Sequence, residues 1–111
     1  MIDWKTEINT ELSRAEQARA DGKEGRARVC ARRAAGIAAR VFLEHHGRIR
    51  RTPSAYDLLR LIYDDDDLPS ELRRMAAELL IPVDQEFKLP DDIDLVQTAK
   101  KFCITLLKIE L

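Results

Sequence analysis

Apolar residues recur along this chain every three or four positions, which is the spacing of one face of an α-helix. The first such stretch predicts a helix that Asp3 caps and that stops at Asp21 and Gly22. Its apolar face consists of Trp4, Ile8, Leu12, Ala15 and Ala18.

The second stretch is rich in alanine and predicts the central helix of a bundle. Its apolar stripe consists of Ala27, Cys30, Ala31, Ala34, Ile37, Ala38, Val41 and Phe42. A glycine in a helix interior costs about 1 kcal/mol relative to alanine, so Gly36 predicts a point where another helix packs closely. Gly47 is expected to end this helix.

A short third helix is expected next. Thr52 or Ser54 can cap it, with Pro53 in its first turn. Its apolar face consists of Leu58, Leu59, Leu61 and Ile62.

The acidic run Asp64 to Asp67 follows the short helix. It lacks the alternating ligands, central glycine and distant glutamate of an EF-hand loop. We therefore expect a solvated connector that caps the next helix.

Two further helices are predicted in the last part of the chain. Pro69 stands in the first turn of the fourth helix, Pro82 ends or kinks it, and Asp91 or Asp92 caps the fifth. The fourth apolar stripe is Leu72, Met75, Ala76, Leu79 and Leu80, and the fifth is Ile93, Val96, Ala99, Phe102 or Cys103, Leu106 and Ile109.

No stretch alternates like a β-strand between turn signals. The pattern predicts an all-α, up-and-down bundle of four main helices plus one short helix, in a single domain over residues 1–111. No apolar run is long enough for a membrane span and no secretory leader is recognisable, so we expect a cytoplasmic protein without a membrane partner.

Cys30 and Cys103 lie inside periodic helical stretches and lack the paired spacing of a zinc site. The expected state is two reduced, buried thiols. The sequence predicts no metal site and no cofactor.

The net charge of −1 conceals a strong segregation of charge along the chain. Residues 26–51 hold eight arginines against Glu44 alone, whereas residues 52–111 hold thirteen acidic and seven basic side chains. A basic block of this kind attracts either a phosphate or acidic parts of the same fold or of a second copy.

The order of these parts resembles the HEPN family, the nucleotide-binding bundles of higher eukaryotes and prokaryotes. The segments that carry the resemblance are "RADGKEGRAR", "RVFLEHHG", "TPSAYDLLRLI", "LPSELRRMAAELL" and "FKLPDD", followed by a final helix with Ala99 in its core, over about residues 5 to 108. The resemblance implies a nucleotide- or RNA-binding bundle that forms a homodimer. It also implies a nucleotidyltransferase subunit as partner, in a pair like a toxin and its antitoxin.

The chain departs from the family's pattern at several positions. Tyr56 stands where many members have histidine, and the Arg-x(4–6)-His motif of the ribonuclease members is absent after Leu80. A literal match lies earlier, where four residues separate Arg40 from His45 and five separate it from His46. About 0.7 such matches are expected by chance in a chain with these counts, so the motif is weak.

Three functions remain open from the residues. The first is a nucleotide- or RNA-binding module in which arginines of the basic block bind anions without cleaving them; the expected anion-binding residues are Arg32, Arg33, Arg40, Arg48, Arg50 and Arg51. The second is a metal-independent ribonuclease toxin, in which His45 or His46 transfers a proton and Arg40 stabilises charge on the phosphate. The third is a bundle that only binds a protein partner. In each case we expect Arg32 and Arg33 to flank the apolar stripe and reach an acidic helix or a phosphate.

Overall fold

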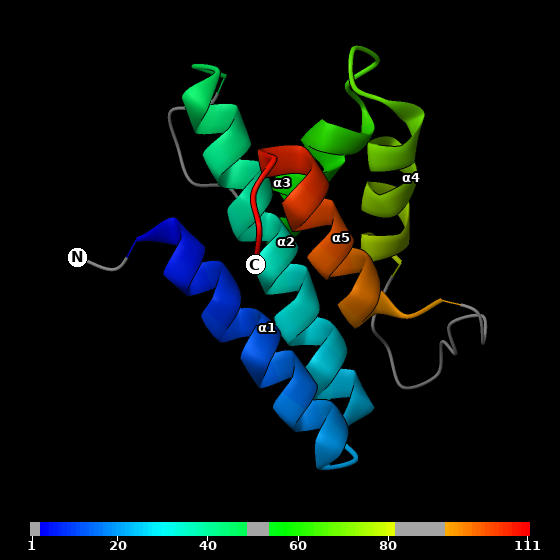
Figure 1. Ribbon diagram of the computed structural model, residues 1–111. Coiled ribbons are helices and arrows are strands. Elements are labelled where there is room, and N and C mark those ends of the chain that lie inside the picture. Colours follow the sequence, from blue (N-terminus) through cyan, green and yellow to red (C-terminus); the bar gives the residue numbers. More distant parts are fainter. Residues whose placement is uncertain (1–2, 49–53, 82–92) are drawn as a thin grey trace.

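The computed structural model describes residues 3–48, 54–81 and 93–111, and all regular structure in these residues is helical. Its five helices are α1 (Trp4–Ala20), α2 (Glu24–His45), α3 (Ala55–Tyr63), α4 (Ser70–Leu79) and α5 (Leu95–Leu107). The predicted all-α bundle is confirmed (Figure 1). At ten residues, α4 is one residue longer than the expected short helix α3.

Helix α2 forms the centre of the bundle. It packs along α1, against α5 and across α3, while α4 packs on α3 and α5 (Figure 1). Because α2 has neighbours on several sides, a broad band of its small side chains is buried: Ala27, Cys30, Ala31, Ala34, Ala35, Gly36, Ala38 and Ala39.

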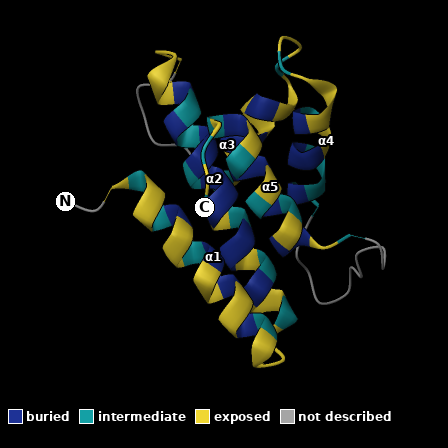
Figure 2. Cartoon of the chain, viewed as in Figure 1, coloured by how far each residue is buried: buried dark blue, intermediate teal, exposed yellow. Residues whose placement is uncertain are grey.

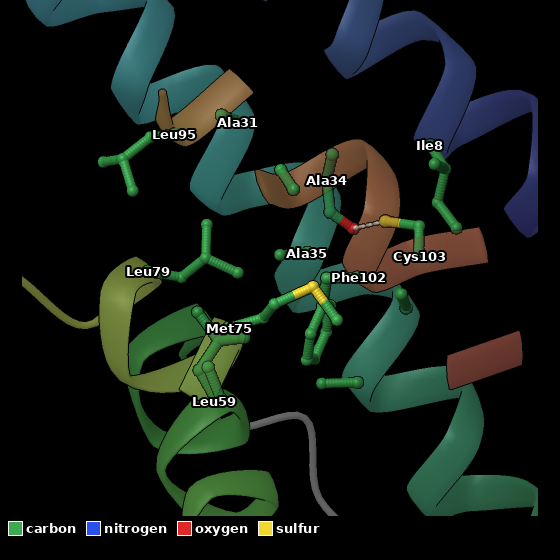
Figure 3. Packing of buried hydrophobic residues seen from close by; sticks show 14 of the residues in the cluster. Ile8, Ala31, Ala34, Ala35, Leu59, Met75, Leu79, Leu95, Phe102 and Cys103 are labelled. Carbon is green, nitrogen blue, oxygen red and sulfur yellow. Dashed lines mark hydrogen bonds between the residues drawn. The ribbon is translucent and has the colours of Figure 1, made fainter. Parts of the chain in front are cut away.

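The buried side chains of all five helices form one hydrophobic cluster. Phe102 of α5 is fully buried, and Met75 of α4 belongs to the same cluster (Figure 3). The Cys103 thiol donates to the carbonyl oxygen of Ala34 at 3.6 Å, which joins α5 to the alanine band of α2. Burial along α1, α2, α4 and α5 largely follows the predicted stripes, with exposed residues on the outward side of α1 (Figure 2). Leu61, expected on the apolar face of α3, is instead exposed, because Leu58, Leu59 and Ile62 form the side of α3 that faces the core.

Several predicted helix ends are confirmed. The Asp3 carboxylate accepts from the backbone N–H of Lys5 at 2.6 Å, and the Ser54 hydroxyl accepts from that of Asp57 at 3.2 Å. Gly47 follows α2 with a φ of +64°, a conformation that strongly favours glycine. Thr52 and Pro53 lie outside the described residues.

Two predicted caps are corrected. Pro69 occupies the N-cap position of α4, which has no side-chain cap, and Asp65 instead accepts from the backbone N–H of Asp67 within the connector. Helix α5 is capped by Asp94, whose carboxylate accepts from the backbone N–H of Gln97 at 3.1 Å. Pro82, Asp91 and Asp92 lie outside the described residues.

Candidate anion-binding surface on helix α2

Arg32, an expected anion-binding residue, has an internal role. Its Nε donates to the carbonyl oxygen of Leu79 at 2.8 Å, and its guanidinium also donates to the carbonyl oxygen of Ile81. These oxygens lie at the end of α4, where carbonyls have no partner within the helix. Arg32 therefore reaches backbone oxygens and not the expected acidic helix. Its burial lowers the pKa of the guanidinium, which retains its charge.

Arg40 is held by carboxylates on two helices. Its guanidinium lies 3.3 Å from Glu7 Oε2 on α1 and 3.8 Å from Glu44 Oε1 one turn later on α2. The basic block is thus partly neutralised inside the fold, which is one of the alternatives that its segregated charge left open.

Arg48 has an acidic partner in the connector between α3 and α4. Its guanidinium lies 2.5 Å from Asp65 Oδ2. The pKa of Asp65 is lowered, first by the hydrogen bond from the backbone N–H of Asp67 and then by Arg48. Arg50 and Arg51 lie outside the described residues.

Arg26, Arg28 and Arg33 differ from the other arginines of the chain. Within the described residues, none of the three makes an ion pair or a hydrogen bond with a carboxylate or carbonyl oxygen, although the charge of Arg28 helps to lower the pKa of Glu24. The other eight described arginines all have one: Arg14, Arg19, Arg32, Arg40, Arg48, Arg60, Arg73 and Arg74. The three arginines without a partner all lie in the first half of α2.

We call Arg26, Val29 and Arg33 the α2 arginine face. Arg26 and Arg33 are both exposed and stand seven residues apart, which places them on the same side of the helix at an axial separation of about 10 Å. The side chain of Val29 is exposed at a level between them. The half-buried Arg28 lies about 160° around the helix axis from Arg26 and belongs to another side of the helix. The face thus combines two cations with a small apolar residue.

The sequence analysis predicts Arg33 as an anion-binding residue but does not predict Arg26 or Arg28. Their helical spacing around Val29 was visible in the sequence. The sequence does not show that they lack carboxylate partners, because this depends on where α1 and the connector lie.

The two histidines are exposed at the end of α2. His46 Nδ1 lies 2.7 Å from the carbonyl oxygen of Phe42, and the two rings are 4.2 Å apart between centroids. This contact holds His46 against its own helix.

A groove of about 290 Å³ lies between α1, α2 and α3. Arg33 and Arg40 line it from α2, and Glu7 and Glu11 from α1. The remaining lining residues are Gly36, Ile37, Ala55 and Leu58. Arg40 and Arg33 therefore share a groove, whereas neither histidine lines it.

No group of three or more histidine, cysteine or carboxylate side chains within the described parts of the chain is arranged to hold a metal ion. None of the helices described is long and apolar enough to cross a membrane. The chain matches no protein-family model, no curated protein and no solved structure.

Proposed function

We propose that this chain is a non-catalytic binding module whose α2 arginine face binds the phosphates of a nucleotide or an RNA. The observation that supports the proposal is that Arg26 and Arg33 stand on one side of α2 and make no ion pair or hydrogen bond with a carboxylate among the described residues; Arg28, further around the helix, makes none either. The eight other described arginines each have an internal acceptor.

An arginine that already has a carboxylate partner must give it up to bind a phosphate. Arg40 and Arg48 have such partners, at 3.3 Å and 2.5 Å. Arg26 and Arg33 bind a phosphate without giving up such a partner, and a guanidinium presents paired donors to phosphate oxygens. The face is therefore a better anion site than the arginines toward the end of α2.

A matched pair of double variants tests the proposal. We expect Arg26→Glu/Arg33→Glu to weaken the binding of fluorescein-labelled single-stranded RNA at least about tenfold in an anisotropy titration, because two attractions to phosphate become repulsions. Arg14→Glu/Arg74→Glu makes the same change in net charge at two exposed arginines outside the face. If both double variants weaken binding equally, only net charge matters and the face is not the site.

The ribonuclease alternative is decided by a cleavage assay. Arg40 faces two carboxylates that compete with a phosphate for its guanidinium, and the groove that it lines holds no histidine. We therefore expect no cleavage of labelled RNA in the presence of a chelator. Cleavage that Arg40→Ala or His45→Ala abolishes without unfolding would replace the binding proposal with the ribonuclease.

The resemblance to HEPN proteins adds two partners to the proposal, a second copy of the chain and a nucleotidyltransferase subunit. If the protein binds neither nucleotides nor RNA in a salt-sensitive manner, the remaining candidate for the arginine face is an acidic protein.

A further inference from the structure

The outer side of α3 concentrates the exposed apolar surface of the molecule. Within the described residues, four large apolar or aromatic side chains are exposed, and three of them belong to this nine-residue helix: Tyr56 at 50%, Leu61 at 38% and Tyr63 at 39%. Grouped exposed aromatic and aliphatic side chains are typical of binding surfaces, and tyrosine and arginine are enriched there.

We call the exposed residues of this helix the α3 outer face: Tyr56, Asp57, Arg60, Leu61, Tyr63 and Asp64. The opposite side of α3 is buried in the core through Leu58, Leu59 and Ile62. The outer face is therefore fixed in place by its own packing and is available to another molecule.

The order of residues on this face is self-complementary. When two copies of the helix pack antiparallel around a twofold axis, the residues of one run in the opposite direction along the other. If the twofold axis passes midway between residues 58 and 59, Asp57 of one copy lies opposite Arg60 of the other. Tyr56 of one copy then lies opposite Leu61 of the other.

The two central charges are held on the surface by neighbours of their own chain. The Ser54 hydroxyl donates to Asp57 Oδ2 at 3.0 Å, and Arg60 Nε lies 3.4 Å from Asp64 Oδ2. The Arg60 guanidinium also lies 5.8 Å from the centre of the Tyr63 ring. Asp57 and Arg60 stand three residues apart, so both project from the middle of the exposed side.

We infer that the α3 outer face binds a second copy of this chain, through an antiparallel α3 pair in which Asp57 of each copy meets Arg60 of the other. The inference rests on the homodimer included in the proposed function and is independent of anion binding. Opposite charges at the centre, with tyrosine and leucine around them, favour this occupant. Because a single short helix from each copy makes a small interface, we expect a weak dimer, with a Kd on the order of 100 μM.

Complementary charge reversals test the inference by sedimentation velocity at protein concentrations up to about 0.5 mM. We expect wild-type protein to dimerise, and Asp57→Arg and Arg60→Asp each to lower the affinity at least about tenfold, because each places like charges at the interface. An equimolar mixture of the two variants should dimerise again, because every pair across the axis is then opposite in charge. The double variant Asp57→Arg/Arg60→Asp should recover dimerisation as well.

The inference is wrong if wild-type protein remains monomeric, if the single variants associate as well as wild type, or if the mixture fails to associate. Circular dichroism checks that each variant folds. Should a charge reversal unfold the chain, Tyr56→Ser at the half-exposed ring replaces it and should likewise weaken dimerisation. The Arg26→Glu/Arg33→Glu protein should dimerise like wild type. A loss of dimerisation can therefore be distinguished from a loss of anion binding.

Discussion

Ala55 of α3 lies directly against Gly36 of α2. A Cβ atom built on Gly36 would stand 2.6 Å from Ala55 Cβ and 3.0 Å from Ala55 Cα. The close approach expected at this glycine is confirmed, and α3 crosses α2 where α2 has no side chain.

Gly36→Ala should destabilise the protein by about 1–3 kcal/mol. The clash with the backbone and side chain of Ala55 exceeds the gain in helix propensity of about 1 kcal/mol. Urea unfolding followed by circular dichroism measures the change. Gly25→Ala is the matched control in the same helix, because a Cβ there has no atom within 4 Å. An unchanged or raised stability of Gly36→Ala would contradict the packing described.

Arg32→Met should lower the free energy of unfolding by about 1–3 kcal/mol, because it leaves the carbonyl oxygens of Leu79 and Ile81 without a donor. Arg33→Met changes an exposed neighbour and should alter stability by less than about 0.5 kcal/mol. The same urea experiment compares the two. If both variants change the free energy of unfolding equally, the hydrogen bonds of Arg32 make no measurable contribution to stability.

Arg19 joins three parts of the fold and makes stability depend on acid pH. Its guanidinium lies 2.6 Å from Glu24 Oε1 at the start of α2 and 3.0 Å from Asp94 Oδ1 at the cap of α5. The hydrogen bonds from Arg19 are the main cause of the lowered pKa of each carboxylate. This contribution is therefore complete above the ordinary pKa values of 4.5 and 3.8, and it is lost as the pH falls through the lowered values.

Arg19→Gln should accordingly cost about 1 kcal/mol at neutral pH, since the pairs are partly exposed. The difference from wild type should shrink as the pH falls through the lowered pKa values of Glu24 and Asp94, because both carboxylates then become protonated. Urea unfolding at a series of pH values from neutral into the acid range measures it. A difference that stays constant with pH would mean that Arg19 acts through packing and not through these ion pairs.

Both cysteines should be unreactive in the folded protein. Cys30 and Cys103 are free and buried, and burial raises the pKa of the Cys103 thiol to about 12. At mildly alkaline pH this group is almost entirely protonated, and the thiolate is the reactive form. A chromogenic disulfide reagent should label two thiols in urea and none in native buffer. Rapid labelling of native protein would contradict the burial of the two thiols.

The fold could be predicted largely from the sequence because each helix has its own apolar periodicity. In addition, a small residue indicates where two helices approach each other most closely. Gly36 and the alanines of α2 contain that information directly. The sequence predicts Asp91 or Asp92 as the cap of α5 because several acidic residues precede that helix, and local spacing does not distinguish them from Asp94, which is the cap in the structure.

The candidate site was only partly predictable for a different reason. The acceptors of Arg32 are the backbone carbonyls of Leu79, at the end of α4, and of Ile81, just after it, and such carbonyls have no signature in the sequence. The carboxylates near Arg40 and Arg48 come from α1 and from the connector, so which arginines have acidic partners depends on tertiary packing. Arg26 and Arg28 could be recognised only after those partners were located.

The salt dependence of RNA binding tests the central claim most directly. Anisotropy titrations at several KCl concentrations give the slope of log K against log salt, to which each neutralised phosphate of a single strand contributes about 0.7 in magnitude. We predict that Arg26→Gln and Arg33→Gln each reduce the magnitude of that slope by about this amount, while Arg74→Gln, outside the face, leaves it unchanged. Binding that is insensitive to salt, or slopes that are equal in all three variants, would contradict an anion site on the α2 arginine face.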